Sequence, residues 1–239
     1  MEQRPDLNNE LVLRCYVGRD MEVMVDPSLL VDMEAKAVEM ARGSGRILQG
    51  RFGRPMDVEY KEDGKNAPVT LADKESQAYL SESITAKFPD HDIVGEEDPE
   101  GKQGSVADFV WVLDPLDGTT NFLNGLPIYA VSICALHRGV PVVGSIYIPW
   151  PGDKDGRVLH SRKGGGARMD GRPLSILESQ VPEAGLLSGL PGSFLAQFSP
   201  RKGLRTRLGE PRVTGSVAYE LALTAIGAFQ YVVFGGPRI

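Results

Sequence analysis

Cysteine and histidine are scarce in this sequence. The 239-residue chain holds two cysteines, Cys15 and Cys134, and three histidines. Each cysteine lies among apolar residues, so we expect two buried, reduced thiols rather than a disulfide. The histidines are scattered along the chain, and no Cys/His cluster has the spacing of zinc ligands. The sequence therefore predicts neither a zinc enzyme nor a disulfide-stabilised secreted domain.

An excess of basic residues and a long apolar run are also missing. The formal net charge is −6, whereas nucleic-acid-binding proteins usually present a basic face, so we expect no nucleic-acid partner. No apolar stretch is long enough to span a bilayer, which predicts no membrane segment. The N-terminal MEQRPDLNNE lacks the basic-then-apolar layout of a signal peptide. These absences lead us to expect a cytoplasmic protein.

The composition is that of an ordinary globular protein. Apolar residues make up 41% of the chain and charged residues 24%, and a chain of this length can bury a substantial core. Residues 1–25 favour neither helix nor strand, so we treat them as an unassigned N-terminal extension. Residues 26–239 are predicted to form one α+β domain.

Apolar periodicity predicts two amphipathic helices followed by a region rich in strands. Thr70 and Asp73 form a capping box at the start of the second helix, and Gly43 and Gly45 weaken the end of the first. The predicted elements are helices at 29–48 and 71–88, a short strand that runs into an acidic turn within 92–98, a strand at 108–113, two hairpins within 130–149 and 157–176, and a helix followed by a strand within 215–234.

Four acidic residues stand out: Asp73, Glu96, Asp114 and Asp117. Glu96 follows one predicted strand, and Asp114 and Asp117 end the next one in WVLDPLDGTTNF (111–122). If these strands are neighbours, their ends bring carboxylates to one rim, where mutual repulsion favours binding of a cation. Magnesium prefers such oxygen ligands. The alternative is a solvated turn, because Asp-Gly is a common turn pair.

The residues after the second aspartate complement the predicted metal site. Gly118 lets the backbone approach a ligand closely, and amide groups at the start of a helix attract anions. Thr119 and Thr120 add two hydroxyl groups, of which Thr119 is placed to orient a water molecule. Metal on one side and amides on the other suit the hydrolysis of a phosphate monoester.

These motifs resemble the inositol monophosphatase family of magnesium-dependent, lithium-sensitive phosphatases, over about residues 30–239. The strings that carry the resemblance are VTLAD (69–73), GEED (95–98), WVLDPLDGTTNF (111–122), GGGARMDGRPL (164–174) and VTGSVAYELALTAIGAF (213–229). The resemblance implies a layered α-β-α-β-α sandwich of the inositol monophosphatase and fructose-1,6-bisphosphatase type. It also implies a homodimer.

The resemblance further implies a set of metal ligands. Mg²⁺, as two or three ions, would be bound by Glu96, Asp114, Asp117 and the backbone carbonyl of Leu116. Glu96 and Thr119 would position the attacking water. No covalent phosphoenzyme is expected.

The remaining site residues follow from the same resemblance. Asp73 would support the attacking water or a third, weaker metal. The phosphate would be bound by Asp117, Gly118, Thr119 and Thr120.

Two departures from the family pattern shape the expected activity. The family's Trp-Asp-x-Ala-Ala-Gly motif would follow FQYVVFGGPRI (229–239), so we expect a domain truncated at Ile239, with the C-terminal part of the fold missing. Phe234 aligns with a glutamate that contacts the inositol ring. The expected substrate is inositol monophosphate or a related polyol or sugar phosphate. The alternatives are histidinol phosphate, fructose-1,6-bisphosphate or a nucleotide bisphosphate, or an inactive metal- and phosphate-binding fragment.

Overall fold

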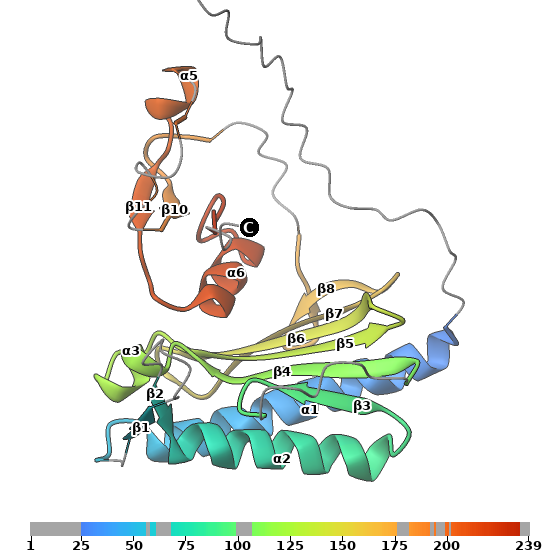
Figure 1. Cartoon of the computed structure of the whole chain (residues 1–239). Coiled ribbons are helices and arrows are strands. Elements are labelled where there is room, and N and C mark those ends of the chain that lie inside the picture. The colour runs from blue at the N-terminus through green and yellow to red at the C-terminus, as the bar shows by residue number, and fades with distance from the viewer. Residues whose placement is uncertain are drawn as a thin grey trace, which may run out of the picture.

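A seven-stranded sheet forms the centre of the molecule (Figure 1). The computed structural model describes residues 25–55, 58–60, 68–98, 107–175, 182–191, 194, 199–200 and 202–234. The sheet order is β3-β4-β5-β6-β7-β8-β9, with β3 parallel to β4 and every other pair antiparallel. Its strands are β3 (Asp92–Gly95), β4 (Phe109–Asp117), β5 (Ala130–His137), β6 (Val140–Trp150), β7 (Asp153–Arg162), β8 (Gly166–Met169) and β9 (Arg172–Pro173).

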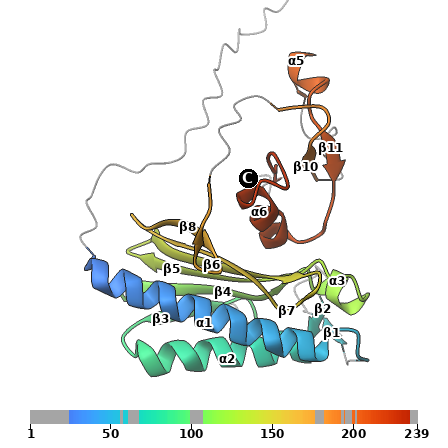
Figure 2. The same ribbon diagram turned by 180° about the vertical axis from the view of Figure 1, so that it is seen from behind.

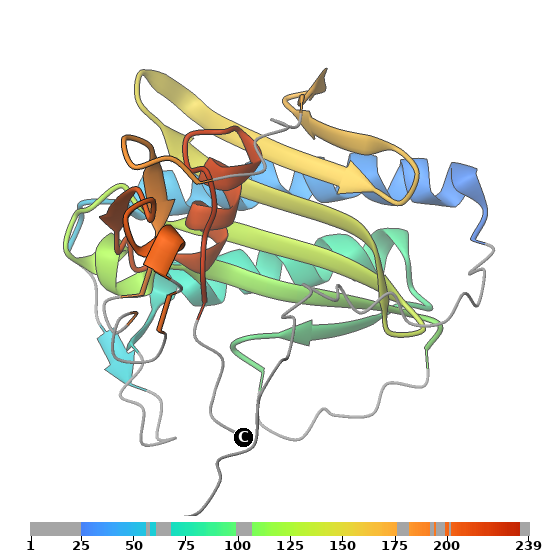
Figure 3. The same ribbon diagram turned by 90° about the horizontal axis from the view of Figure 1, so that it is seen from above.

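Helices cover both faces of this sheet. Two long helices, α1 (Pro27–Arg51) and α2 (Leu71–Lys87), lie against one face, and α6 (Val217–Ala225) lies on the other (Figures 1 and 2). Seen from above, the strands lie side by side over the two long helices (Figure 3). The short elements are α3 (Thr119–Leu123), α5 (Lys202–Arg205), β1 (Val58–Tyr60), β2 (Pro68–Thr70), β10 (Leu187–Gly189) and β11 (Glu210–Arg212).

The first long helix runs past its predicted end. Asp26 caps it by accepting a hydrogen bond from Ser28 N at 2.9 Å, and the helix continues through Gly43 and Gly45 to Arg51. A Cβ atom at Gly45 would lie 2.4 Å from the ring of Tyr147. These glycines therefore allow close packing against neighbouring aromatic rings, and the prediction that they weaken the helix end is wrong.

The second long helix begins with the predicted capping box. Thr70 Oγ1 accepts hydrogen bonds from Ala72 N and Asp73 N, and Asp73 Oδ2 accepts one from Thr70 N at 2.7 Å. The box satisfies backbone donors that lack a partner at a helix start. It also fixes the Asp73 carboxylate at the first turn of α2.

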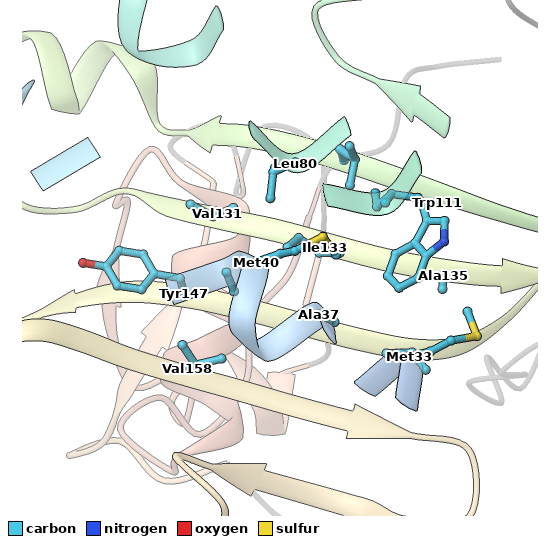
Figure 4. Packing of buried hydrophobic residues seen from close by; sticks show 14 of the residues in the cluster. Met33, Ala37, Met40, Leu80, Trp111, Val131, Ile133, Ala135, Tyr147 and Val158 are labelled. Carbon is cyan, nitrogen blue, oxygen red and sulfur yellow. The ribbon is translucent and has the colours of Figure 1, made fainter. Parts of the chain in front are cut away.

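The main core lies between the two long helices and the sheet (Figure 4). Trp111 of β4 and Tyr147 of β6 are fully buried there, against Met33 and Met40 of α1 and Leu80 of α2. Burial of this apolar surface is the main favourable term in the free energy of folding. The carboxyl end of β4 is thus attached to a rigid platform.

The chain forms a small second sheet before it reaches α6, and this sheet lies on the far side of α6 from the main sheet (Figure 1). There β10 and β11 pair in parallel, and α5 lies beyond them (Figure 1). The predicted last strand is reduced to an isolated bridge between Gly189 and Val232, because Gln230 N and Val233 N donate only to the short β10. The layers alternate between helices and sheets, as predicted. The predicted N-terminal extension falls outside the described residues, apart from Val25.

Both predicted hairpin regions are present, because β5 pairs antiparallel with β6, and β8 pairs antiparallel with β7 and β9. Two of the turns between these strands lie at Arg138-Gly139 and Asp170-Gly171. Arg138 and Gly139 have φ values of 50° and 80°, and Asp170 and Gly171 have 50° and 79°. Such pairs of left-handed residues match the twist of the strands that they connect. None of the helices within the described ranges is long and apolar enough to cross a bilayer.

Candidate active site

The predicted acidic rim lies where two neighbouring parallel strands end. Gly95 of β3 pairs with Leu113 of β4, and Glu96 N continues the ladder by donating to Leu113 O at 3.0 Å. The pairing of β4 with β5 becomes irregular between Asp114 and Asp117, where Pro115 has no amide hydrogen to donate. The strands thus bring Glu96 and the two aspartates to one edge of the sheet, as the sequence predicts.

The charges at this edge act on one another. Burial raises the pKa of Asp114 to about 8, and the nearby carboxylates of Glu96 and Asp117 add to the rise. Leu116 N stabilises Asp114 by donating to its Oδ1 at 3.2 Å. An ionised carboxylate among such neighbours is stabilised when a cation shares the site.

Asp117 is hydrogen-bonded to the start of α6, on the opposite face of the sheet from α1 and α2. Ser216 Oγ donates to Asp117 Oδ2 at 2.7 Å, and Ala218 N donates to the same oxygen. Burial raises the pKa of Asp117, and these hydrogen bonds oppose the rise. Ser216 is the N-cap of α6, so the carboxylate also lies at the positive end of the helix dipole. Ser216 was not among the predicted site residues, although a serine before an Ala-rich stretch is an N-cap signal.

Asp73 and Thr119 are brought together from α2 and α3. Thr119 Oγ1 lies 3.3 Å from Asp73 Oδ1 and 3.0 Å from Leu116 O. Asp73 is 2% exposed. Burial raises its pKa, and the hydrogen bonds from Thr70 and Thr119 oppose the rise. This contact joins the capped start of α2 to the turn after Asp117.

A buried serine of α2 contacts the segment between Asp114 and Asp117. Ser76 Oγ donates to Pro115 O at 3.0 Å and lies 2.5 Å from Ser44 Oγ of α1. Both serines are fully buried. Ser76 is three residues after Asp73, so the two side chains project from the same face of α2. The helix thus holds the aspartate motif at two points.

Gly118 is required by the backbone at the start of α3. Its φ is 89°, and a Cβ atom there would lie 2.9 Å from Ile128 O and 3.0 Å from Ser216 Cβ. The first amides of a helix have no partner within it, so α3 begins with donors beside the carboxylates. Thr120 is exposed, and its carbonyl accepts a bond from Asn124 Nδ2 at 2.7 Å.

The donor set suits a hard cation that keeps much of its hydration. Among the residues that the structure describes, no group of three or more His, Cys, Asp or Glu side chains is arranged to hold a metal ion. Magnesium is commonly held by only one or two carboxylates, with waters and substrate phosphate oxygens completing its shell. The residues that would hold such an ion here are Glu96 and Asp114, at adjacent strand ends.

Comparison with known proteins gives one consistent result. A model of the inositol monophosphatase family matches residues 30–239. The fructose-1,6-bisphosphatase/inositol-1-monophosphatase of Aquifex aeolicus is 32% identical over 194 residues, which cover 79% of this chain and 71% of the relative. The Nus factor SuhB of Escherichia coli K12 is 32% identical over 204 residues, which cover 80% of this chain and 72% of the relative.

Solved structures of similar fold agree with these matches. A Thermotoga maritima IMPase superimposes with a TM-score of 0.68 at 30% identity, covering 83% of this chain and 74% of that structure. An IMPase/NADP phosphatase complexed with Mg²⁺ and phosphate superimposes with a TM-score of 0.65 at 18% identity, covering 84% and 73%. The second likeness concerns the fold alone. The predicted layered fold is confirmed by both superpositions.

Proposed function

This chain belongs to the inositol monophosphatase family, and from that premise we propose that it hydrolyses a small phosphate monoester with Mg²⁺ as its cofactor. The chain is thereby a phosphoric monoester hydrolase. The observation that carries the proposal is that Glu96 and Asp114 meet at adjacent strand ends, where the charge of Glu96 adds to the rise in the pKa of Asp114. The carboxylates would hold the metal, and water would attack phosphorus directly.

The metal ligands in this proposal are Glu96, Asp114, Asp117 and the Leu116 carbonyl. Bound Mg²⁺ would neutralise phosphate oxygens and make water a better nucleophile. Asp114 interacts with both Glu96 and Asp117, while Asp117 has one oxygen hydrogen-bonded to Ser216 and Ala218. Two or three ions would occupy the site, as the family resemblance implies, and lithium would inhibit.

Thr119 would orient the attacking water, with support from Asp73. The Thr119 hydroxyl lies within donating distance of Asp73 Oδ1 and Leu116 O, so its lone pairs remain able to accept a hydrogen bond from water. Glu96 would orient the same water, with Asp73 as support. The backbone amides of Gly118 and Thr119, with Thr120 beside them, would bind the phosphate opposite the metal.

The substrate would be inositol monophosphate or a related polyol or sugar phosphate. Fructose-1,6-bisphosphate is the favoured alternative, because the Aquifex relative is named for both activities. Phe234, which is 41% exposed, lies where an inositol-contacting glutamate is expected, and phenylalanine accepts no hydroxyl hydrogen bond. Histidinol phosphate and nucleotide bisphosphates remain as further candidates. We place the catalytic domain within residues 26–239 and propose a cytoplasmic homodimer.

The test is phosphate release from a panel of these phosphate esters, measured with Mg²⁺, with EDTA and with added Li⁺. We expect Mg²⁺-dependent release from at least one ester, inhibited by Li⁺, and its loss in Asp114→Asn. Activity that survives Asp114→Asn would contradict the metal assignment. Mg²⁺ binding without release of phosphate from any ester would instead support an inactive metal- and phosphate-binding protein.

A further inference from the structure

Gln77 of α2 holds the turn that carries Glu96. Its side-chain oxygen accepts a hydrogen bond from Glu97 N at 3.0 Å, and its amide nitrogen donates to Asp98 Oδ1 at 3.0 Å. Gln77 is 9% exposed, and both bonds are partly buried. Breaking them would leave the buried Gln77 amide without these partners, which costs free energy.

The turn is fixed on its other side by the sheet. Glu96 N donates to Leu113 O of β4 at 3.0 Å. Within the turn, Gly95 N donates to Asp98 Oδ2 at 3.2 Å, and Asp98 N donates to Gly95 O at 3.2 Å. The backbone before Glu96 is therefore set by β4, and the backbone after it is set by Gln77.

Gly95 is shaped to admit the glutamine. A Cβ atom at this position would lie 2.5 Å from the Gln77 side-chain carbon Cδ, closer than real atoms approach. The φ of Gly95 is not among the positive values, so its backbone conformation is open to other residues. Glycine at position 95 is therefore needed for the close approach of the Gln77 amide. The position of the amide depends on both residues.

A glutamine amide matches what this turn offers. Glu97 N only donates, and the Asp98 carboxylate only accepts, so the partner needs one acceptor and one donor. A glutamate at position 77 would keep the acceptor, lose the donor and add a negative charge beside Asp98. A methionine would keep the length and packing and lose both bonds.

We propose that Gln77 is a positioning residue that sets the location of the Glu96 carboxylate relative to Asp114 and thereby the affinity for Mg²⁺. This inference rests on the proposed function, because it assigns Glu96 to the metal site. Gln77 itself contacts neither the metal nor the substrate. Residues that orient metal ligands typically change metal affinity by about 10- to 100-fold when they are mutated.

The experiment compares Gln77→Met with Gln230→Met in the full chain. Gln230 also uses both ends of its side-chain amide, at a remote place: it accepts from Glu183 N at 2.8 Å and donates to Glu183 O and Ser188 Oγ, each at 3.0 Å. Mg²⁺ affinity is measured by calorimetry and folding by circular dichroism. We expect affinity about tenfold weaker in Gln77→Met, with kcat restored at saturating Mg²⁺, and wild-type affinity in Gln230→Met. Gly95→Ala should reproduce the loss by displacing the amide.

The outcomes separate the inference from the function on which it rests. Equal Mg²⁺ affinity in Gln77→Met and the wild type, or equal weakening in Gln230→Met, overturns the positioning role and leaves phosphatase activity untouched. Weaker Mg²⁺ binding by Gln77→Met supports the role, even if the wild type hydrolyses no ester and the proposed reaction fails. A wild-type chain that binds no Mg²⁺ overturns both. If Gln77→Met does not fold, Gly95→Ala decides by the same measurements.

Discussion

Asp114 carries a thermodynamic cost that its proposed role explains. Its carboxylate is partly buried beside Glu96 and Asp117, and that environment raises its pKa to about 8. Like charges in a low-dielectric site destabilise the folded state unless a proton or a cation is bound. Residues at functional sites often reduce stability in this way.

Replacing Asp114 should therefore separate stability from function. We predict that Asp114→Asn raises the thermal midpoint in EDTA by about 2–4 °C, as expected for ~1 kcal/mol in a chain of this size, and abolishes Mg²⁺ binding. Thermal melts with EDTA and with Mg²⁺ measure both effects. Glu39→Gln, on the exposed side of α1, is the control and should change neither. A lower thermal midpoint of Asp114→Asn in EDTA would show that the Asp114 carboxylate does not destabilise the metal-free fold.

Gly118 offers a second prediction at the residue scale. Alanine at this position would combine a positive φ with contacts to Ile128 O and Ser216 Cβ. We predict that Gly118→Ala lowers the free energy of unfolding by about 1–3 kcal/mol, measured by urea denaturation. Gly125 also has a positive φ, of 73°, but open space around it, so Gly125→Ala should cost less. Equal costs would mean that the close contacts relax freely.

At the scale of elements, features that depend on neighbouring residues were predicted better than features that depend on packing between distant parts of the chain. The capping box of Thr70 and Asp73 was predicted correctly because all its atoms lie within one turn. The continuation of α1 through Gly45 was not predicted, because Gly45 packs against Tyr147, which lies about a hundred residues away in a different element. The parallel pairing of β3 with β4 was only a condition of the site prediction, since no local signal specifies a strand's neighbour.

The site shows the same division between local and distant information. Asp114, Asp117 and Gly118 lie in one short string, so their clustering is visible in the sequence. Ser216 binds Asp117 across 99 positions, and Gln77 reaches Asp98 from another element. Such partners depend on where a helix is placed against the sheet, and periodicity alone does not encode that placement.

An ion cluster joins α1 to the hairpins at the other edge of the sheet. Asp170 accepts hydrogen bonds from Arg42 of α1 at 2.5 Å, from Arg157 of β7 at 3.0 Å and from Val158 N at 3.1 Å. Burial acts to raise the pKa of Asp170, but these bonds outweigh it and the pKa lies below its ordinary value. The ionised form is therefore more stable in the folded chain than in the unfolded one.

The stability that Asp170 contributes should depend on pH with a definite sign. A carboxylate with a lowered folded pKa stabilises the fold above its unfolded pKa and loses that contribution as pH falls through the folded value. We predict that the wild type exceeds Asp170→Asn by about 1 kcal/mol near pH 6, with the difference shrinking below pH ~4. Asparagine also tolerates the φ of 50° at this position.

Chemical denaturation across pH measures this difference. Asp108→Asn is the matched control, because Asp108 pairs with Arg138 in an exposed position where ion pairs contribute little. A wild-type advantage that grows toward low pH would contradict the assigned sign.

At the scale of the whole molecule, the aspartate motif also joins two layers. Asp117 binds the start of α6 through Ser216 and Ala218. Asn121 Nδ2, four residues later, donates to Thr214 O at 2.8 Å and to Ile128 O at 2.8 Å. The segment that holds the proposed phosphate site is thus the same segment that attaches the α6 layer to the main sheet. If the α6 layer opened, this segment would lose its hydrogen bonds to α6, and the proposed phosphate site would lose its support.

Loss of this joint should loosen one layer and leave the other intact. Asn121→Ala leaves the carbonyls of Ile128 and Thr214 without this donor, which costs about 1–3 kcal/mol. We predict faster amide hydrogen exchange in residues 210–226 and unchanged exchange in β5, β6 and β7, because these strands remain packed on α1 and α2 in the main core and less strongly held segments open as units of their own. Asn124→Ala is the control, since the Asn124 side chain donates to Thr120 O within its own turn, and its exchange pattern should match the wild type. Uniformly faster exchange in both layers would mean that they unfold as one unit, and the motif would then act on the whole domain rather than on the joint.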